Sequence, residues 1–88
     1  MAMIKLAQPT QEEFAVPVHF SYMQIADDIA ERIRVGEYAD GEQLPSYSNL
    51  AELYSVGTTT ARDAYRELRA RGLVEGIPGK GVFVRVAN

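Results

Sequence analysis

Glycine and proline recur along this chain at short intervals, and their spacing limits each helix to a few turns. Gly36, Gly57 and Gly72 stand where helices can end or break, and Pro45 cannot lie inside a helix. Near the C-terminal end, Pro78-Gly79-Lys80-Gly81 is a strong turn signal. The chain is therefore expected to fold from short helices followed by a pair of strands that a tight turn connects.

The first helix is expected over residues 22–35. Ser21 fits the N-cap position, Gln24 completes a capping box with it, and Phe20 and Ile25 fit a hydrophobic staple. An apolar stripe at helical spacing marks the buried side: Ile25, Ala26, Ile29, Ala30 and Ile33. We expect this helix to serve as scaffold.

Two further helices flank a break at Ser55-Val56-Gly57. The earlier one is expected over residues 47–54, capped by Ser46, with Leu50, Ala51 and Leu53 facing inward. The later one is expected over residues 58–71, and its inward stripe is Ala61, Ala64, Tyr65 and Leu68. Two short helices around a turn that contains glycine form the helix-turn-helix motif.

Two extended runs, residues 73–77 and 82–86, end the chain, and the second is rich in β-branched residues. The turn between them makes an antiparallel hairpin, or wing, with Lys80 at its tip. Residues 19–88 are thus predicted to form a mainly α winged helix-turn-helix of three helices plus a small β-hairpin. Residues 1–18 form an irregular arm, either a frayed terminus or a segment that docks on this domain or on a second subunit.

Size and composition exclude several classes of protein. A domain takes roughly 100–200 residues, so 88 residues make one small domain. The chain has no cysteine, which rules out disulfides, thiolate zinc sites and cysteine nucleophiles and favours a reducing compartment. No apolar run approaches the roughly 18 residues of a membrane span. We expect a soluble, cytoplasmic protein without a membrane partner.

The sequence shows no catalytic, metal or cofactor constellation. His19 is the only histidine, and it has no Cys or His partner at metal-binding spacing. Glu12-Glu13 and Asp27-Asp28 are adjacent pairs, and adjacent residues on a helix point in different directions. Gly79-Lys80-Gly81 lacks the remainder of a phosphate-binding loop. We therefore expect no enzyme activity, no metal and no cofactor.

Charge is distributed unevenly along the chain, whose net charge is −3. Residues 1–56 carry three basic and nine acidic side chains, whereas residues 57–88 carry six basic and three acidic ones, so the two parts have net charges of −6 and +3. This asymmetry indicates that the C-terminal part meets an anionic partner. The alternative is that these basic residues only solvate a helix face.

The start of the third helix carries groups suited to DNA. Thr58, Thr59 and Thr60 offer hydroxyls beside the free backbone N–H groups of the first turn, and threonine methyls can contact thymine. Arg62 can bind a phosphate or form two hydrogen bonds with guanine. The alternative is that Thr58 only caps the helix and Arg62 is merely exposed. Toward the end of that helix, Arg66, Arg69 and Arg71 are interpreted as mainly structural, with Asp63 or Glu67 as partners.

Ser46, Tyr47 and the wing tip complete the candidate site. A hydroxyl at the start of the second helix suits a phosphate, although Ser46 can equally be a simple N-cap and Tyr47 can stack inside the fold. At the tip, Gly79 lets the backbone approach a partner and Lys80 supplies charge. The alternative there is an ordinary turn with a solvated lysine.

A series of short motifs runs through residues 22–84 in a specific order and spacing. They are Tyr22-Met-Gln-Ile-Ala with Ile29 and Ile33, Gly36-Glu, Gly41-Glu-Gln-Leu-Pro-Ser, Asn49-Leu-Ala-Glu-Leu, Val56, Thr59-Thr-Ala-Arg62, Ala64-Tyr-Arg-Glu-Leu-Arg-Ala-Arg-Gly-Leu-Val-Glu and Gly79-Lys-Gly-Val-Phe-Val84. With these motifs the segment closely resembles the DNA-binding domain of the GntR family of bacterial transcription regulators. The pair Ala64-Tyr65 is most similar to the YtrA and MocR branches.

The resemblance implies a winged helix that dimerises on double-stranded DNA with an inverted-repeat operator. By that analogy Thr59, Thr60 and Arg62 lie on the recognition helix, Ser46 meets the DNA backbone, and Gly79-Lys80 enters the minor groove. Family members also carry a C-terminal effector domain. Because this chain stops just after the wing, we expect no small-molecule effector to bind within it.

Three cations expected from the resemblance are missing. Tyr47-Ser48, Gly57-Thr58 and Gly76-Ile77 stand where the family has basic residues. Each lost phosphate contact flattens the salt dependence of DNA binding by about one unit of slope. We therefore expect weaker and more salt-tolerant binding than is usual in the family, unless base contacts compensate.

These observations favour a sequence-specific DNA-binding transcription regulator, more specifically a repressor. One alternative is a protein-interaction module, which the acidic N-terminal part permits. Another is a DNA-bending accessory protein of a mobile element, which would bind tandem direct sites rather than a palindrome.

Overall fold

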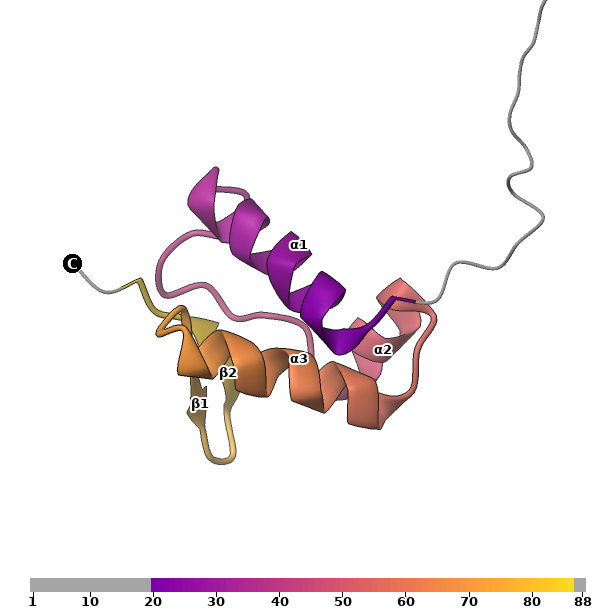
Figure 1. The fold of residues 1–88 in the computed structure, drawn as a ribbon. Helices are drawn as coiled ribbons and strands as arrows, with labels where there is room; N and C mark the ends of the chain where they lie inside the picture. The colour runs from indigo at the N-terminus through magenta and orange to yellow at the C-terminus, as the bar shows by residue number, and fades with distance from the viewer. Residues whose placement is uncertain (1–19, 87–88) are drawn as a thin grey trace, which may run out of the picture.

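The computed structural model describes residues 20–86, so the predicted arm over residues 1–18 and His19 lie outside the described residues. The predicted mainly α winged helix-turn-helix is confirmed (Figure 1). None of the helices in the described part is long and apolar enough to cross a membrane. The elements in chain order are α1 (Tyr22–Arg34), α2 (Tyr47–Tyr54), α3 (Thr58–Ala70), β1 (Val74–Ile77) and β2 (Gly81–Val84).

The predicted ends of α1 are confirmed to within one residue. The backbone N–H of Gln24 donates to Ser21 Oγ at 3.1 Å, and Gln24 Oε1 accepts from the N–H of Ser21 at 2.9 Å, which completes the capping box. Val35 is the C-cap rather than the last helical residue. Phe20, from the predicted staple, packs edge to face against Tyr54 of α2 with ring centroids 5.5 Å apart.

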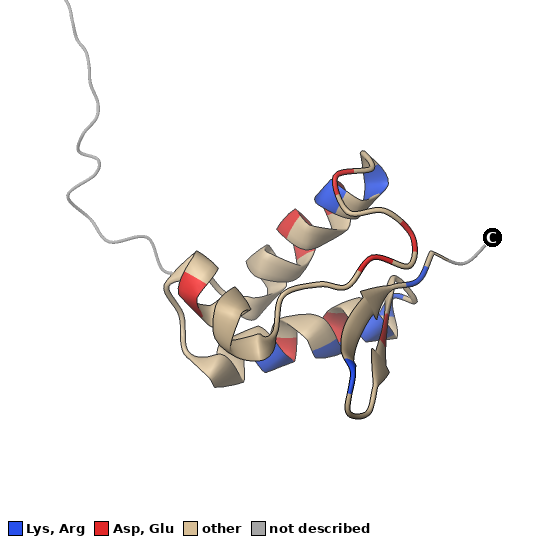
Figure 2. Ribbon diagram, turned by 180° about the vertical axis from the view of Figure 1, so that it is seen from behind, with Lys and Arg blue, Asp and Glu red and all other residues tan. Residues whose placement is uncertain are grey.

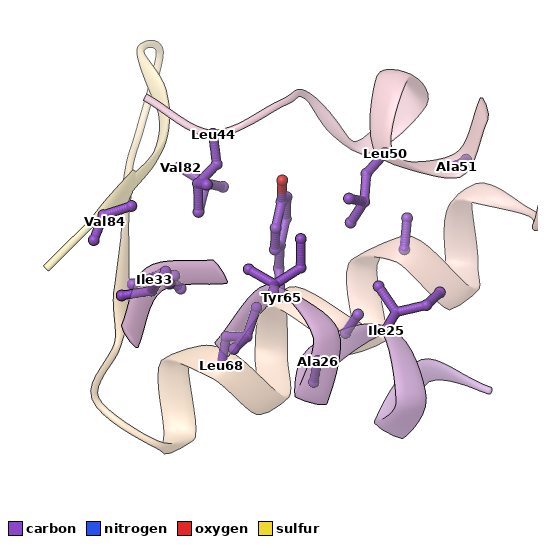
Figure 3. Close-up of a cluster of buried hydrophobic side chains, with 14 residues drawn as sticks. Ile25, Ala26, Ile33, Leu44, Leu50, Ala51, Tyr65, Leu68, Val82 and Val84 are labelled. Atoms are coloured by element: carbon purple, nitrogen blue, oxygen red, sulfur yellow. The ribbon is translucent and has the colours of Figure 1, made fainter. Parts of the chain in front are cut away.

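The core lies between the three helices and the inner side of the hairpin. Tyr65 of α3 stands near its centre, and its oxygen points toward the connector between α1 and α2 (Figure 3). The predicted inward stripes of α1 and α3 are confirmed. The buried residues are Ile25, Ala26, Ile29, Ile33, Leu44, Leu50, Ala51, Ala61, Ala64, Tyr65, Leu68, Val74, Val82 and Val84.

The prediction that Leu53 faces inward is wrong. Its side chain is 65% exposed, while Leu50 and Ala51 are buried as predicted. The inward positions of α2 are Leu50 and Ala51 together with the half-buried Tyr47 and Tyr54, which lie three or four residues from them. Leu53 lies roughly a third of a turn away from their centre, because each residue advances a helix by about 100°.

The hairpin is more firmly attached than the sequence indicated. β1 and β2 pair antiparallel, with Val74 opposite Val84. The connector between α1 and α2 pairs with the other edge of β2. The N–H of Leu44 donates to the carbonyl oxygen of Val82 at 2.8 Å, and the N–H of Val84 donates to the carbonyl oxygen of Glu42 at 2.9 Å. The wing extends beyond α3 on the side away from α1 (Figure 1, and from behind in Figure 2).

Gly81 occupies a backbone conformation that only glycine adopts readily. Its φ is +129°, and a Cβ at this position would lie 2.6 Å from Nε2 of Gln43. We expect Gly81→Ala to lower the free energy of unfolding by about 2 kcal/mol, through backbone strain and loss of the Gln43 contact. Gly79→Asn is the matched control, because φ of Gly79 is +76° with open space around it, and asparagine tolerates that conformation. Urea unfolding followed by circular dichroism measures both, and equal losses would contradict the argument.

A polar network joins α1 to α2. The Tyr54 hydroxyl donates a short hydrogen bond to Oδ2 of Asp28, which also accepts from Nε of Arg32 at 3.0 Å. The pKa of Asp28 lies below its usual value chiefly because of the Tyr54 hydrogen bond; burial opposes this effect, and the Arg32 guanidinium lowers the pKa further. Burial and the neighbouring Asp28 raise the pKa of Tyr54. Asp28 therefore helps to hold α2 on α1 in its ionised form.

The stabilisation from Asp28 is expected to disappear in acid. Because the pKa of Asp28 is depressed in the folded state, its contribution is present above the unfolded value of 3.8 and is lost as the pH falls through the lower, folded value. With allowance for the partial exposure of the pair, Asp28→Asn should cost about 1 kcal/mol at pH 7. Urea unfolding at pH 7 and pH 2.5 measures the difference. A difference that stays constant between the two pH values would overturn the assignment.

Candidate nucleic-acid interface

The N-terminus of α3 has no side-chain cap, unlike those of α1 and α2. Gly57 occupies the N-cap position and makes no side-chain hydrogen bond to the first turn. The backbone N–H groups of Thr58, Thr59 and Thr60 precede the first intrahelical bond, from the N–H of Ala61 to the carbonyl oxygen of Gly57 at 3.1 Å. Thr58 is thus the first helical residue and not the cap, which excludes one alternative interpretation of it.

The predicted site residues on α3 do not all share one face. Thr58 and Arg62 are one turn apart and both exposed, so they lie on the same flank of the helix. Thr60 is half-buried, and it lies on nearly the opposite side from Arg62 because residues two apart are separated by about 200°. Thr59 is exposed between these flanks. Of the three threonines, Thr58 and Thr59 are therefore the better placed for a ligand that Arg62 also contacts.

Tyr47 joins the start of α2 to the outer face of α3. Its ring is half-buried and packs at a tilt on the ring of Tyr65, with centroids 5.7 Å apart. The guanidinium carbon of Arg62 lies 5.3 Å from the centroid of the same Tyr47 ring. This is a cation–π arrangement, and it limits the directions in which Arg62 can point. Tyr47 stacks within the fold and also borders the candidate interface.

Ser46 caps α2 as predicted. Its Oγ accepts a hydrogen bond from the N–H of Asn49 at 3.1 Å. Because a hydroxyl both donates and accepts, the exposed Ser46 can still donate its proton to a phosphate. Tyr65 fixes the backbone just before this cap, since its hydroxyl donates to the carbonyl oxygen of Pro45 at 2.7 Å. Burial of the Tyr65 side chain raises the pKa of its hydroxyl, so this hydroxyl keeps its proton at neutral pH.

The wing tip is a tight turn that a side chain of the connector clamps. The N–H of Lys80 donates to the carbonyl oxygen of Ile77 at 2.9 Å, and Pro78 followed by Gly79 with φ of +76° matches a type II turn. Nε2 of Gln43 donates to the carbonyl oxygen of Lys80 at 2.8 Å. The Lys80 side chain is exposed. No pattern in the sequence predicts the contact with Gln43, which lies 37 residues away in the chain.

Ion pairing separates the basic side chains of residues 20–86 into two groups. Five arginines pair with carboxylates: Arg32, Arg34, Arg66, Arg71 and Arg85. The remaining three basic side chains of this part of the chain, Arg62, Arg69 and Lys80, make no such pair and belong to α3 and the wing. Figure 2 shows basic positions along α3 and on the hairpin, apart from those at the end of α1. Of these three unpaired cations, Arg62 and Lys80 belong to the predicted site and Arg69 does not.

Arg69 is the residue that the sequence interpretation missed. Arg66 and Arg71 pair with Asp63 and Glu67 as expected, and Arg71 also reaches Asp27 of α1 at 2.8 Å. Arg69 instead lies against the wing. A signal did exist, because no acidic residue stands three or four positions from Arg69 or from Arg62. Arginines without such a neighbour are the ones that remain free.

The exposed, unpaired cations on α3 and on the wing have the arrangement of a DNA-binding winged helix. A sequence profile described as "Bacterial regulatory proteins, gntR family" matches residues 21–84. The chain belongs to the GntR family. The description of this family is that of bacterial regulatory proteins.

Known GntR proteins resemble the chain in sequence and in structure. The mannosyl-D-glycerate transport/metabolism system repressor MngR of Escherichia coli (strain K12) is 41% identical over 64 residues, which are 73% of this chain and 27% of that protein. A regulator of Streptomyces coelicolor, SCO4628, is also 41% identical over 64 residues, covering 73% of this chain and 24% of its own length. The chain spans about a quarter of the length of these curated relatives.

The structural matches show the same GntR domain. YtrA from Sulfolobus acidocaldarius, described as a GntR-family transcription factor, superposes with a TM-score of 0.70 and is 34% identical, covering 76% of this chain and 70% of that one. The DNA-binding domain of AraR in complex with operator ORR3 superposes with a TM-score of 0.68 and is 28% identical, covering 72% of this chain and 76% of that one.

Proposed function

We propose that this GntR-family chain is a sequence-specific repressor that acts in the cytoplasm as a homodimer on an inverted-repeat operator. In this proposal α3 lies in the major groove, with Thr58, Thr59, Thr60 and Arg62 at the base edges or adjacent phosphates. Ser46 and Tyr47 lie at the DNA backbone, and Gly79 and Lys80 lie in the minor groove. Thr60 takes the most peripheral place, because it is half-buried on the other flank of α3.

One observation carries the proposal: the unpaired cations of residues 20–86 gather on α3 and the wing. An exposed arginine without a carboxylate partner keeps its full charge and all its donors for a ligand. Such groups on a helix and on a neighbouring hairpin match the two grooves of a duplex, which lie side by side along its surface. The five paired arginines serve the fold instead.

Three finer parts of the proposal rest on support from relatives and from geometry. Repression is supported by the name of MngR and by the simple physical effect of covering an operator. The homodimer is proposed together with the inverted repeat, because the two halves of such a site match a dimer with two-fold symmetry. Placement near the YtrA and MocR branches is supported by the pair Ala64-Tyr65 and by the structural match to YtrA.

Selection of bound duplexes from a random DNA pool at moderate salt tests the proposal. The 88-residue chain is used, with Arg62→Ala as the matched control, because this exposed residue has no part in the core. We expect the wild-type chain to enrich an inverted repeat whose half-sites lie about one helical turn apart or closer. We expect the variant to lose that enrichment.

Other outcomes of the selection contradict defined parts of the proposal. Enrichment of a single half-site contradicts the homodimer. Enrichment of tandem direct sites together with bending of the DNA favours an accessory role. If the wild-type chain enriches no sequence above the Arg62→Ala control, sequence-specific binding is contradicted. The protein-interaction module then becomes the favoured function.

A further inference from the structure

A groove with a volume of about 470 Å³ separates the wing from α3 and the start of α2. Its lining includes Ser46 and Tyr47 from the start of α2, Arg69 from α3, and the turn with Lys80. Two of the three unpaired cations in the described part of the chain, Arg69 and Lys80, thus line the same groove. The proposed base-reading side chains at the start of α3 do not line the groove. Base reading therefore does not account for the two cations in it.

The position of Arg69 depends on the glycine opposite it. A Cβ at Gly76 of β1 would lie 3.0 Å from Nη2 and 3.8 Å from Cζ of Arg69. The guanidinium group therefore lies directly over the strand where a side chain would otherwise stand. Arg69 is exposed, and it belongs to the same flank of α3 as Arg62, since seven residues make about two turns. The Arg69 side chain of α3 thus occupies the space that a side chain at position 76 of β1 would need.

The path of a DNA strand explains this arrangement. The phosphate backbone of each strand separates the major groove from the minor groove. When α3 lies in one groove and the wing in the other, one backbone must therefore pass between them. In this fold the space between them is the groove that Arg69, Lys80 and Ser46 line. Guanidinium groups bind phosphate oxygens with two parallel hydrogen bonds, which suits an arginine at this place.

We infer that Arg69 binds a phosphate of the DNA strand that passes between α3 and the wing, and that Gly76 provides the space for it. The inference rests on the proposed DNA-binding mode. It also changes one expectation from the sequence. Of the three cations missing relative to the family, the one at Gly76-Ile77 is replaced by an arginine from α3, so the loss of phosphate contacts is smaller than the wing sequence indicates.

Salt-dependent binding to the selected duplex tests the role of Arg69. Removing one phosphate contact lowers the slope of log K against log salt concentration by about one unit and weakens binding to all sequences alike. We expect Arg69→Gln to show this change, with affinity about tenfold lower at moderate salt and an unchanged sequence preference. Arg34→Gln is the matched control: it removes the same charge from the end of α1, and Arg34 is paired with Glu31 there. Its slope should equal that of the wild type.

Moving the charge provides a second, independent readout. In the double variant Arg69→Gln/Gly76→Arg, the cation returns to the same space from β1, and we expect the wild-type slope to return with it. Replacing single phosphates of the duplex by neutral methylphosphonates should reveal one position that weakens the wild type but not Arg69→Gln. Thermal unfolding of each variant reports whether the fold is intact.

The outcomes distinguish this inference from the proposed function. If the wild-type chain binds no duplex, the proposed function fails and the inference fails with it. If the wild type selects a duplex and folded Arg69→Gln keeps the full salt slope, the inference alone is overturned. A change of sequence preference in Arg69→Gln would also overturn it, because it would place Arg69 at a base instead of a phosphate.

Discussion

Replacement of Tyr65 by alanine is expected to lower the free energy of unfolding by about 4 kcal/mol, a large part of the stability of so small a domain. Tyr65 is fully buried among core side chains from the helices and the wing (Figure 3), and its ring packs on that of Tyr47. Its removal leaves a cavity that the short helices cannot close, and the carbonyl oxygen of Pro45 loses its hydrogen-bond donor. Urea unfolding monitored by circular dichroism measures the loss.

Tyr65→Phe is the matched control for this cavity. It keeps the ring and its contact with Tyr47, and it removes only the hydroxyl that binds Pro45. A loss of about 1 kcal/mol is expected for a single hydrogen bond. If the alanine variant were as stable as the phenylalanine variant, the ring would have no structural role and the description of the core would be wrong.

Replacement of Arg62 by alanine is expected to weaken binding to the selected operator by about 10- to 100-fold. A bidentate contact from arginine to guanine contributes about 1–3 kcal/mol of discrimination between bases, and this side chain is exposed, unpaired and held near the start of α3. Binding to unrelated duplexes should fall much less. Fluorescence anisotropy with the operator and with a scrambled duplex measures both affinities.

The substitution Arg62→Lys separates base reading from charge. Lysine keeps the positive charge but loses the planar pair of donors and the stacking on Tyr47. We expect it to restore non-specific binding while most of the sequence preference stays lost. An equal loss of affinity for both duplexes in Arg62→Ala would instead identify Arg62 as a phosphate contact.

Much of the fold could be predicted because local signals determine it. Three examples are the hydroxyl of Ser21, which caps α1, Gly72, whose positive φ follows the end of α3, and the apolar face of α3 around Tyr65. Each of these signals acts within a few residues of its own position. Leu53 was the exception within the helices. In a helix of only two turns, a leucine on either flank is compatible with the apolar pattern, and tertiary packing decides which side is buried.

The contacts that complete the candidate site are long-range, and the sequence does not reveal their partners. Gln43 reaches the wing tip across 37 residues, and Arg69 lies over a glycine of β1. Tyr47 was assigned either to the fold or to the interface, whereas its ring packs on Tyr65 and also supports Arg62. Each of these depends on how the elements pack against one another and not on residue type alone.

The pairing of the connector with β2 has a consequence for recognition. Residues 41–44 bind along the edge of β2, and the chain then continues through Pro45 directly into the cap of α2. Main-chain hydrogen bonds therefore tie the wing to the connector, and the connector sets the distance between the wing and the start of α2. In the proposed complex, a duplex that does not match this separation has to deform in order to bind, so affinity would depend on the shape of the DNA as well as on its bases.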